Sequence, residues 1–243
     1  MEVMPLADRQ LARNNRAKAS HSQTARQALA AVSPRGLFDS VQPENARLML
    51  LAAVSAFARH GYHATTTREI ASILGLSPAA VYAHFPTKAD LLYEASLRAN
   101  EDVRNLLKEV ITQEREPVAV IAAIVRASVL WHAEEHIFAN AVNSNFRALD
   151  EERLAPIMKL RREVTATVQH EIRKGVSSGV FRPLDIKGAT IALLRMVDVA
   201  SWYSDKGPMS PEQLADIYVD LILHMLCAEP ADMPPARSIQ PGS

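Results

Sequence analysis

The stretch AFARHGYHATTTREIASILGLSPAAVYAHFPTKADLL, residues 56–92, decides the fold, because helix-ending and helix-starting residues alternate along it. Gly61 and Gly75 suit helix ends that need a positive φ, and Pro86 ends a further helical segment. The apolar residues between these breaks recur at helical spacing instead of alternating as in a strand. The stretch therefore predicts short helices separated by tight turns.

The two segments that follow Gly61 each begin with a cap. Thr66 can cap one helix with Glu69 as its capping-box partner, and Ser77-Pro78 gives the next helix a cap and a first-turn proline. A short helix, a tight turn at Gly75-Leu76 and a second short helix make a helix-turn-helix, the unit that presents its second helix to a major groove. The pattern predicts a DNA-binding head.

The helical pattern continues on both sides of this stretch. Before it, Pro43 suits the first turn of a helix whose apolar residues share one face, namely Met49, Leu50, Ala53, Val54 and Phe57. After it, Thr87 and Asp90 start a long helix that runs to about Glu109. Further helices, and no convincing strand, are predicted over residues 117–133, 137–149, 151–178, 185–203 and 211–227. The predicted fold class is all-α.

The composition favours a folded helical protein with a sizeable core. Hydrophobic residues make up 48% of the 243 residues, and only 5% are aromatic. Lys and Arg total 27, as do Asp and Glu, so the overall charge predicts neither a nucleic-acid nor a membrane partner. Any affinity for DNA must come from a local surface.

The single cysteine, Cys227, excludes an intramolecular disulfide and a multi-cysteine zinc cluster. The first residues, MEVMPLADRQLARNN, lack the apolar run of a signal peptide, and no window has the length of a membrane span. These features predict a soluble, cytoplasmic protein without a membrane partner.

Residues 1–43 predict a disordered basic arm. They lack apolar periodicity, and between Arg9 and Arg35 they carry six basic residues and no acid. Such a segment can follow DNA phosphates or enter a minor groove, or it can be a solvated tail that only aids solubility. At the other end, the Pro-rich residues 229–243 predict a disordered tail.

The stretch quoted above closely resembles the DNA-binding head of the TetR family of transcriptional regulators. The matching positions are Phe57, Gly61, Tyr62, Thr66, Thr67, Ile70, Ala71, Gly75, Ser77, Val81, Tyr82, His84, Phe85, Lys88 and Leu91-Leu92. The resemblance implies a helix-turn-helix domain at 44–95 in which Tyr82 and Lys88 bind phosphates of double-stranded DNA. The residues predicted to bind DNA are Thr66, Thr67, Ser77, Pro78, Ala79, Ala80, Tyr82, His84 and Lys88.

The recognition helix departs from the family pattern at two positions. The family commonly has a polar or basic residue where Pro78 stands and glycine where Ala79 stands. With so few donors, readout is expected to use contacts with thymine methyl groups and DNA shape. For two residues a purely structural role stays open. Tyr82 can be a half-buried ring under this helix, and His84 can be an ordinary surface or cap histidine.

The second half of the chain is similar to TetR-family regulators of lipid, steroid or acyl-CoA breakdown. The similarity rests on Gly-Val-Phe-Arg-Pro at 179–183, Trp202-Tyr203, and Gly-Pro-Met-Ser-Pro-Glu-Gln-Leu at 207–214. It implies a ligand-binding and dimerisation domain at 96–228, whose last two helices form a four-helix bundle with a second subunit. It also implies a small hydrophobic acid or acyl-CoA as effector.

The residues predicted to bind this effector are Trp131, Phe138, Phe146, Met158, Arg195 and Trp202. Aromatic and methionine side chains are more often plain core, and that alternative stays open. Arg195 is an isolated cation between apolar residues. If buried, it would need an anion, either Asp198 or a carboxylate or phosphate of the ligand.

Other classes of protein find less support in the sequence. It has no Gly-rich phosphate loop and no nucleophile elbow, so no catalytic residues, cofactor or enzymatic activity are predicted. His132 and His136 have the spacing of a helical metal pair but no obvious third ligand, so no metal site is predicted. The chain is interpreted as a homodimeric repressor that an effector releases from a pseudo-palindromic operator, with a helical enzyme, metal-binding protein or adaptor as the alternative.

Overall fold

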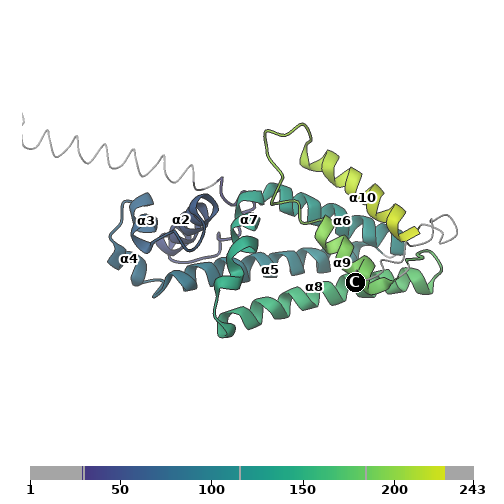
Figure 1. Ribbon diagram of the computed structural model, residues 1–243, viewed down its shortest axis with the longest axis horizontal. Helices are drawn as coiled ribbons and strands as arrows, with labels where there is room; N and C mark the ends of the chain where they lie inside the picture. The colour runs from purple at the N-terminus through teal and green to yellow at the C-terminus, as the bar shows by residue number, and fades with distance from the viewer. Residues whose placement is uncertain (1–28, 30, 115, 184, 228–243) are drawn as a thin grey trace, which may run out of the picture. The chain divides into compact units, whose positions relative to one another are not determined.

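The computed structural model describes residues 29, 31–114, 116–183 and 185–227 (Figure 1). Over these residues every regular element is a helix, and the predicted all-α class is confirmed. The helices are α2 (Glu44–His60), α3 (Thr67–Ile73), α4 (Pro78–Tyr82), α5 (Lys88–Gln113), α6 (Pro117–Glu134), α7 (His136–Asn145), the short 3-10 helix η1 (Phe146–Ala148), α8 (Glu151–Ser177), α9 (Ile186–Met196) and α10 (Pro211–Cys227).

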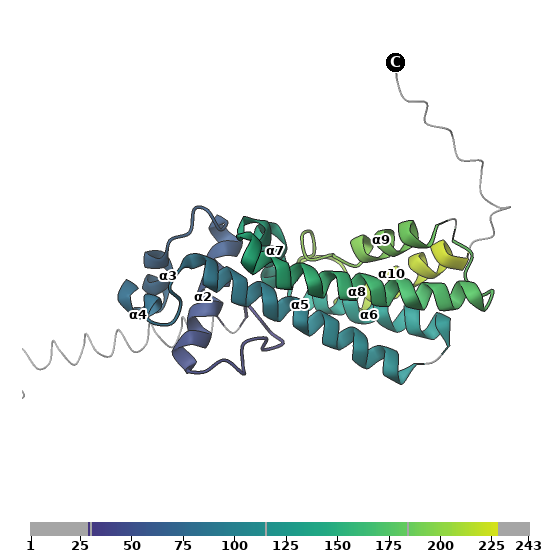
Figure 2. The same cartoon turned by 90° about the horizontal axis from the view of Figure 1, so that it is seen from below.

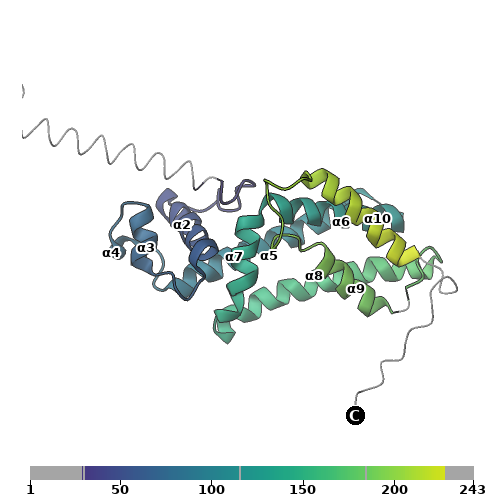
Figure 3. The same ribbon diagram turned by 45° about the horizontal axis from the view of Figure 1, so that its top comes forward.

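The chain divides into two compact units. One, called the head unit here, contains the described residues up to Asp102 together with 134–160 and 200–203. The other, the body unit, contains 103–133, 161–199 and the described residues from Ser204 onward. The head unit is therefore larger than the predicted domain at 44–95. It takes in α7 because α2 packs against both α3 and α7 (Figure 3).

The helix-turn-helix has the caps that the sequence predicts. The hydroxyl of Thr66 accepts the backbone N–H of Glu69 at 3.2 Å, and that of Ser77 accepts the N–H of Ala80 at 3.3 Å. Gly75 ends the turn after α3 with φ at 67°, a left-handed conformation that favours glycine. These local interactions fix where α3 and α4 begin and end.

Apolar side chains from three helices form the core behind α3 and α4. Phe57 of α2, Ile70 of α3 and Val81 of α4 are all buried, whereas Phe85 is only half-buried. Full burial of such side chains stabilises a small domain by about 1.5–3 kcal/mol each. Helix α4 is too short to be stable by itself, so this core is what holds it against α2 and α3.

Residues 31–43, called the strap here, differ from the predicted disordered arm. Val32, Phe38 and Val41 are buried, and the ring of Phe38 meets Phe138 of α7 edge-on at 5.4 Å between centroids. The segment lacks helical periodicity because it folds as successive turns, and its apolar residues supply the burial that orders it. Residues 1–28 and 228–243, with most of the predicted arm and the predicted tail, lie outside the described residues.

The body unit has a core of aliphatic side chains and a second apolar surface that is exposed. The buried set includes Ile121, Ile124, Val125, Val168, Ile172, Leu193 and Ile222. Helices α9 and α10 pack against each other (Figure 2). They leave Ile191, Ile217 and Leu221 each more than 40% exposed, so an apolar face is unpartnered in the monomer.

Among the described residues, α6 is the one helix long and apolar enough to cross a membrane by length and composition. Core helices pass the same test, and 44% of the α6 window is buried. Val120, Ile121, Ile124 and Val125 supply part of this burial. These four residues belong to the core of the body unit.

Glu135 lies at the break between α6 and α7 and is fully buried. Its Oε1 accepts the backbone N–H of Arg35 at 2.6 Å, whereas its Oε2 has no hydrogen-bond partner. Burial raises the pKa of this carboxyl to about 7, against the opposing effect of hydrogen bonds from Arg35 and Ser33. The folded head therefore favours the protonated form.

This raised pKa predicts a pH dependence of stability. Between the ordinary pKa of glutamate, about 4.5, and the folded value, the folded state binds more protons than the unfolded state. The free energy of unfolding should therefore fall by on the order of 3 kcal/mol as pH rises through this interval. Glu135→Gln should flatten this fall. Urea denaturation of both proteins from pH 4.5 to 8 measures it, and parallel curves would contradict the prediction.

Candidate functional site

The recognition helix α4 and its surroundings form the candidate DNA-binding surface. All nine residues predicted to bind DNA belong to the head unit, on α3, α4, the turns beside them and the start of α5. None of the nine is buried, and Ser77, Ala79, Tyr82 and His84 are exposed. The surface thus offers hydroxyl groups, one imidazole and small apolar side chains, the chemistry of phosphate contacts and thymine-methyl contacts.

Tyr82 joins the two helices of the motif. Its hydroxyl lies 2.8 Å from the hydroxyl of Thr67 at the start of α3, and the residue is 49% exposed. The ring is therefore oriented by the protein while one side of it stays accessible. This geometry suits a side chain that contacts a phosphate from a fixed position.

Lys88 has a structural role that the sequence does not reveal. Its ammonium donates to the backbone carbonyls of Tyr62 at 2.6 Å and Thr65 at 2.8 Å, and lies 4.3 Å from the centroid of the Tyr62 ring. Burial lowers the pKa of this ammonium. Lys88 therefore closes the loop between α2 and α3, and a phosphate would have to share the ammonium with these carbonyls.

Two further side chains connect the helix-turn-helix motif to α7 and α8. The side-chain oxygen of Asn145, at the end of α7, accepts the N–H of Tyr62 at 3.2 Å. Arg153 of α8 donates to Oδ1 of Asp90 from Nη2 at 2.6 Å and also pairs with Asp150. Both residues hold the structure next to the motif, yet neither of these roles carries a signal in the sequence, because Asp90 is 63 residues from Arg153 and Tyr62 is 83 residues from Asn145.

Hydrogen bonds from Thr87 and Arg153 favour the charged form of Asp90. Burial alone would raise the pKa of Asp90, but hydrogen bonds from Thr87 and Arg153 outweigh burial and lower the pKa. Asp90 also caps α5 by accepting the N–H and the hydroxyl of Thr87, each at 2.8 Å. One carboxylate therefore fixes both the start of α5 and the position of Arg153.

The residues predicted to bind the effector differ in burial and in the unit to which they belong. Trp131, Phe138 and Phe146 are buried, Met158 is half-buried, and Arg195 and Trp202 are exposed. Trp131 and Arg195 belong to the body unit, whereas the other four belong to the head unit. Phe138 packs edge-on against Phe38, which is the plain core role. Because Arg195 is exposed, it does not need a buried anion.

Asp198 instead faces a histidine inside the body unit. Its Oδ1 lies 3.6 Å from Nε2 of His132, and Nδ1 of the same ring lies 2.8 Å from the carbonyl of Ser128. Burial lowers the pKa of His132, and Asp198 opposes that effect. Among the described residues no group of three His, Cys, Asp or Glu side chains is placed to hold a metal ion.

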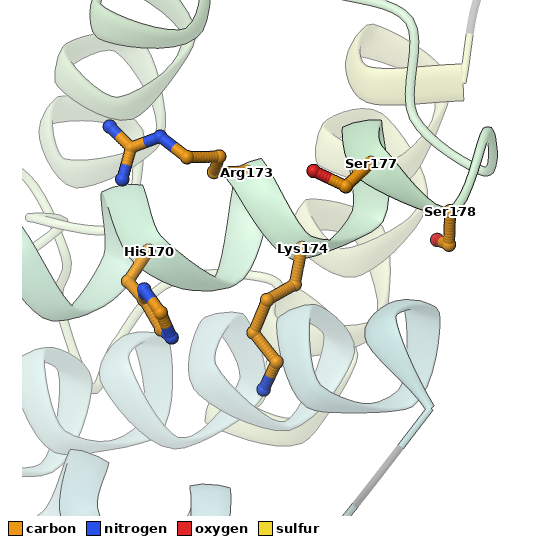
Figure 4. A pocket seen from close by; sticks show the side chains of 5 residues that line it. All are labelled: His170, Arg173, Lys174, Ser177 and Ser178. Carbon is orange, nitrogen blue, oxygen red and sulfur yellow. The ribbon is translucent and has the colours of Figure 1, made fainter.

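The hollow shown in Figure 4 lies on the last turns of α8. It measures about 490 Å³ and is lined by His170, Arg173, Lys174, Ser177 and Ser178. Lys174 pairs with Glu171 at 2.7 Å. In the figure Arg173 points away from His170 and Lys174, so the three basic groups do not converge on one point. None of the predicted effector residues lines this hollow.

Both parts of the chain match models of one protein family. Residues 49–95 match "Bacterial regulatory proteins, tetR family", and residues 114–226 match "Tetracyclin repressor-like, C-terminal domain". Together the two matched segments contain the motif α3–α4 and most of the body unit.

Relatives and solved structures agree with these matches. The chain is 35% identical to a TetR-family regulatory protein of Rhodococcus RHA1, with a TM-score of 0.73 over 77% of this chain and all of that one. It is 28% identical to the HTH-type transcriptional repressor KstR2 of Mycolicibacterium smegmatis, over 75% of this chain and 91% of the relative. A structure of AibR with isovaleryl coenzyme A and operator DNA is 22% identical, with a TM-score of 0.65 over 75% of this chain and 97% of that one. The chain belongs to the TetR family, whose members are transcriptional regulators and not enzymes.

Proposed function

We propose that this chain is a homodimeric, cytoplasmic repressor that binds a pseudo-palindromic operator and leaves it when an effector binds. The observation that carries the proposal is the exposed helix α4, capped by Ser77 and supported by a buried core of α2 and α3. The relative KstR2 is named a repressor. Selection of bound duplexes from a random pool tests the proposal directly, and failure to enrich any sequence would overturn it.

The nine predicted residues are proposed to divide into two groups. Ser77, Pro78, Ala79 and Ala80 lie at the start of α4, the end from which bases are read. Tyr82, His84 and Lys88, with Thr66 and Thr67, lie beside it and are proposed to contact phosphates, which fix register but not sequence. The small side chains at the helix start favour contact with thymine methyl groups.

Dimerisation is proposed to bury the exposed face of α9 and α10. Ile191, Ile217 and Leu221 lie on these two helices and are exposed in the monomer. A second copy would cover them with the same face, as in a two-fold symmetric interface. The body unit then gives the dimer and the head unit binds DNA, close to the domains predicted at 96–228 and 44–95.

The effector is proposed to be a small hydrophobic acid or its coenzyme A thioester. AibR, which shares the fold, has been crystallised with isovaleryl coenzyme A. In this chain the exposed Arg195 is proposed to meet the anionic end of the ligand. Binding would favour a state of the dimer with lower affinity for DNA, by about 1–3 kcal/mol per effector.

The phosphate contacts give a test on two substitutions. Tyr82→Phe should weaken binding to the selected operator and to an unrelated duplex alike, by about 2–10-fold, since it removes one hydrogen-bonding group. Lys88→Met should weaken both and also lower the free energy of unfolding by about 1–3 kcal/mol, because it leaves carbonyls without their donor. Tyr93→Phe, a half-buried tyrosine of α5 away from the motif, is the matched control. Equal DNA affinity for Tyr82→Phe and the control would contradict the contact.

The effector proposal is tested by calorimetry with free acids and coenzyme A thioesters of increasing chain length. One member should bind and weaken the operator complex, and Arg195→Met should lower that affinity by about tenfold or more, as for a hydrogen bond to a charged group. Arg173→Met, another exposed arginine of the body unit, is the control. Unchanged affinity in Arg195→Met would exclude this residue, and no binding across the panel would exclude the ligand class.

The basic arm is proposed to add phosphate contacts beside the operator. Five of the six basic residues between Arg9 and Arg35 precede residue 29. Each neutralised phosphate adds about 0.9 to the slope of log affinity against log salt, and partial engagement of the arm should add about 2 per protomer. Deleting residues 1–28 should lower this slope and leave the preferred sequence unchanged. An unchanged slope would make the segment a solvated tail.

A further inference from the structure

The strap is a folded segment with its own hydrogen bonds. The N–H groups of Gly36, Asp39 and Val41 donate to the carbonyls of Ser33, Gly36 and Phe38, at 2.9–3.0 Å. Gly36 has φ at 68°, which glycine adopts without strain. Successive turns therefore bring the polar and apolar side chains of the strap toward different neighbours.

The strap contacts four helices, each through a residue that belongs to the head unit. On α2, Arg47 pairs with Asp39 at 3.2 Å, and on α5, Arg98 donates to the hydroxyl of Ser40 at 3.1 Å. On α7, Phe138 packs against Phe38. At the end of α6, Glu134 pairs with the guanidinium of Arg35 at 2.9 Å.

Most of these polar contacts are at the surface, where ion pairs stabilise little. The contact between Arg35 and Glu135 is different, because the carboxyl group is fully buried and accepts a backbone N–H. A side-chain substitution in the strap would leave this N–H in place. Glu135 is thus the group on which the polar anchoring of the strap depends.

The position of Glu135 connects the strap to the motif. Glu135 stands between α6 and α7, and its own carbonyl accepts the N–H of Ala139 in the first turns of α7. Helix α7 packs against α2, and Asn145 at its other end holds the loop that leads into α3. A shift of the strap would therefore change the contacts at both ends of α7.

Other charged groups face this site. Arg35 from the strap and Asp102 from α5 act on the carboxyl of Glu135 with opposite signs. Asp102 also lies 4.0 Å from the guanidinium of Arg35. Ser33 donates a hydrogen bond to the same carboxyl. The buried oxygen Oε2 nonetheless has no partner, so the site is held at an electrostatic cost.

The strap precedes the part of the chain that matches the family, which begins at residue 49. We propose that the strap holds α2 against α7 in the arrangement that binds DNA, and that Glu135 is the positioning residue that anchors it. This inference rests on the proposed DNA binding. It assigns to residues 31–43 a role separate from any electrostatic role of residues 1–28.

The test uses the full chain and three substitutions at neighbouring carboxyl groups. Glu135→Ala removes the acceptor, Glu135→Gln keeps an amide oxygen in its place, and Glu134→Gln changes the partly exposed neighbour. Hydrogen exchange of residues 31–43 reports the strap, and affinity for the duplex selected from a random pool reports the head. Each affinity is measured at low and at high salt.

We expect Glu135→Ala to speed amide exchange in the strap at least tenfold and to weaken DNA binding by about 5–50-fold, by the same factor at both salt concentrations. The salt independence follows because no phosphate contact is lost. Glu135→Gln and Glu134→Gln should stay within about twofold of the parent protein in both measurements. If Glu135→Ala does not fold, Phe38→Ala removes the apolar anchor of the strap and should give the same pattern.

Two results would overturn the inference. A strap that exchanges faster while DNA affinity is unchanged would show that it does not position the head. Unchanged exchange in Glu135→Ala would show that this residue does not anchor the strap. If the parent protein selects no duplex at all, the proposed function fails first, and the exchange measurement still reports whether Glu135 holds the strap.

Discussion

The geometry of the head depends on one charge, the ammonium of Lys88, held between the carbonyls of Tyr62 and Thr65. These carbonyls belong to the loop between α2 and α3, whose polar groups lie outside any helix and need partners of their own. A lysine at the first position of α5 supplies donors with one side chain, and the Tyr62 ring adds a cation–π contact. Helix α3 therefore starts where the loop is closed, and α4 follows from the fixed turn at Gly75. The same ammonium is predicted to contact a DNA phosphate. One group would therefore both close the loop between α2 and α3 and bind DNA.

A second layer of contacts keeps this arrangement in register with the rest of the head unit. The side-chain oxygen of Asn145 accepts the N–H of Tyr62, and Arg153 donates to the carboxylate of Asp90. The same carboxylate also caps α5. Each contact joins the edge of the motif to α7 or the start of α8. The Asp90–Arg153 pair is partly exposed, so it fixes the position of α8 beside the motif more than it adds stability. The DNA-binding unit is thus more than its three short helices.

Local features could be predicted from the sequence because they depend on neighbours along the chain. The caps at Thr66 and Ser77 and the turn at Gly75 each need only a few adjacent residues, and the structure has all of them. The roles of Lys88, Arg153 and Glu135 could not be predicted in this way, because each depends on a partner brought near by the fold. The strap was missed for another reason. Its apolar residues follow no regular period, and its basic content suggested a solvated segment. For the residues predicted to bind the effector, the sequence does not distinguish a core side chain from a ligand contact, because both are apolar and lie at helical spacing; the packing of Phe138 on Phe38 joins residues 100 positions apart.

Burying the carboxyl of Glu135 costs free energy, and that cost says what kind of role the residue has. An apolar side chain of similar volume at the α6–α7 break would avoid the desolvation of a carboxyl whose Oε2 has no partner. Such a replacement would, however, leave the N–H of Arg35 without an acceptor in a part-buried place. The carboxyl oxygen Oε1 is the acceptor that lets a turn of irregular backbone pack against the junction of α6 and α7. Its burial is therefore explained by the position it gives the strap and not by net stability. His132 and Asp198 present the same balance in the body unit, where burial opposes the charge of the ring and Asp198 favours it. Glu135 stands at the α6–α7 break, where the backbone changes direction, whereas His132 lies within α6 and meets Asp198 just after the end of α9. In both places the fold holds a titratable group against the cost of its burial, because a neighbouring polar group needs it as a partner.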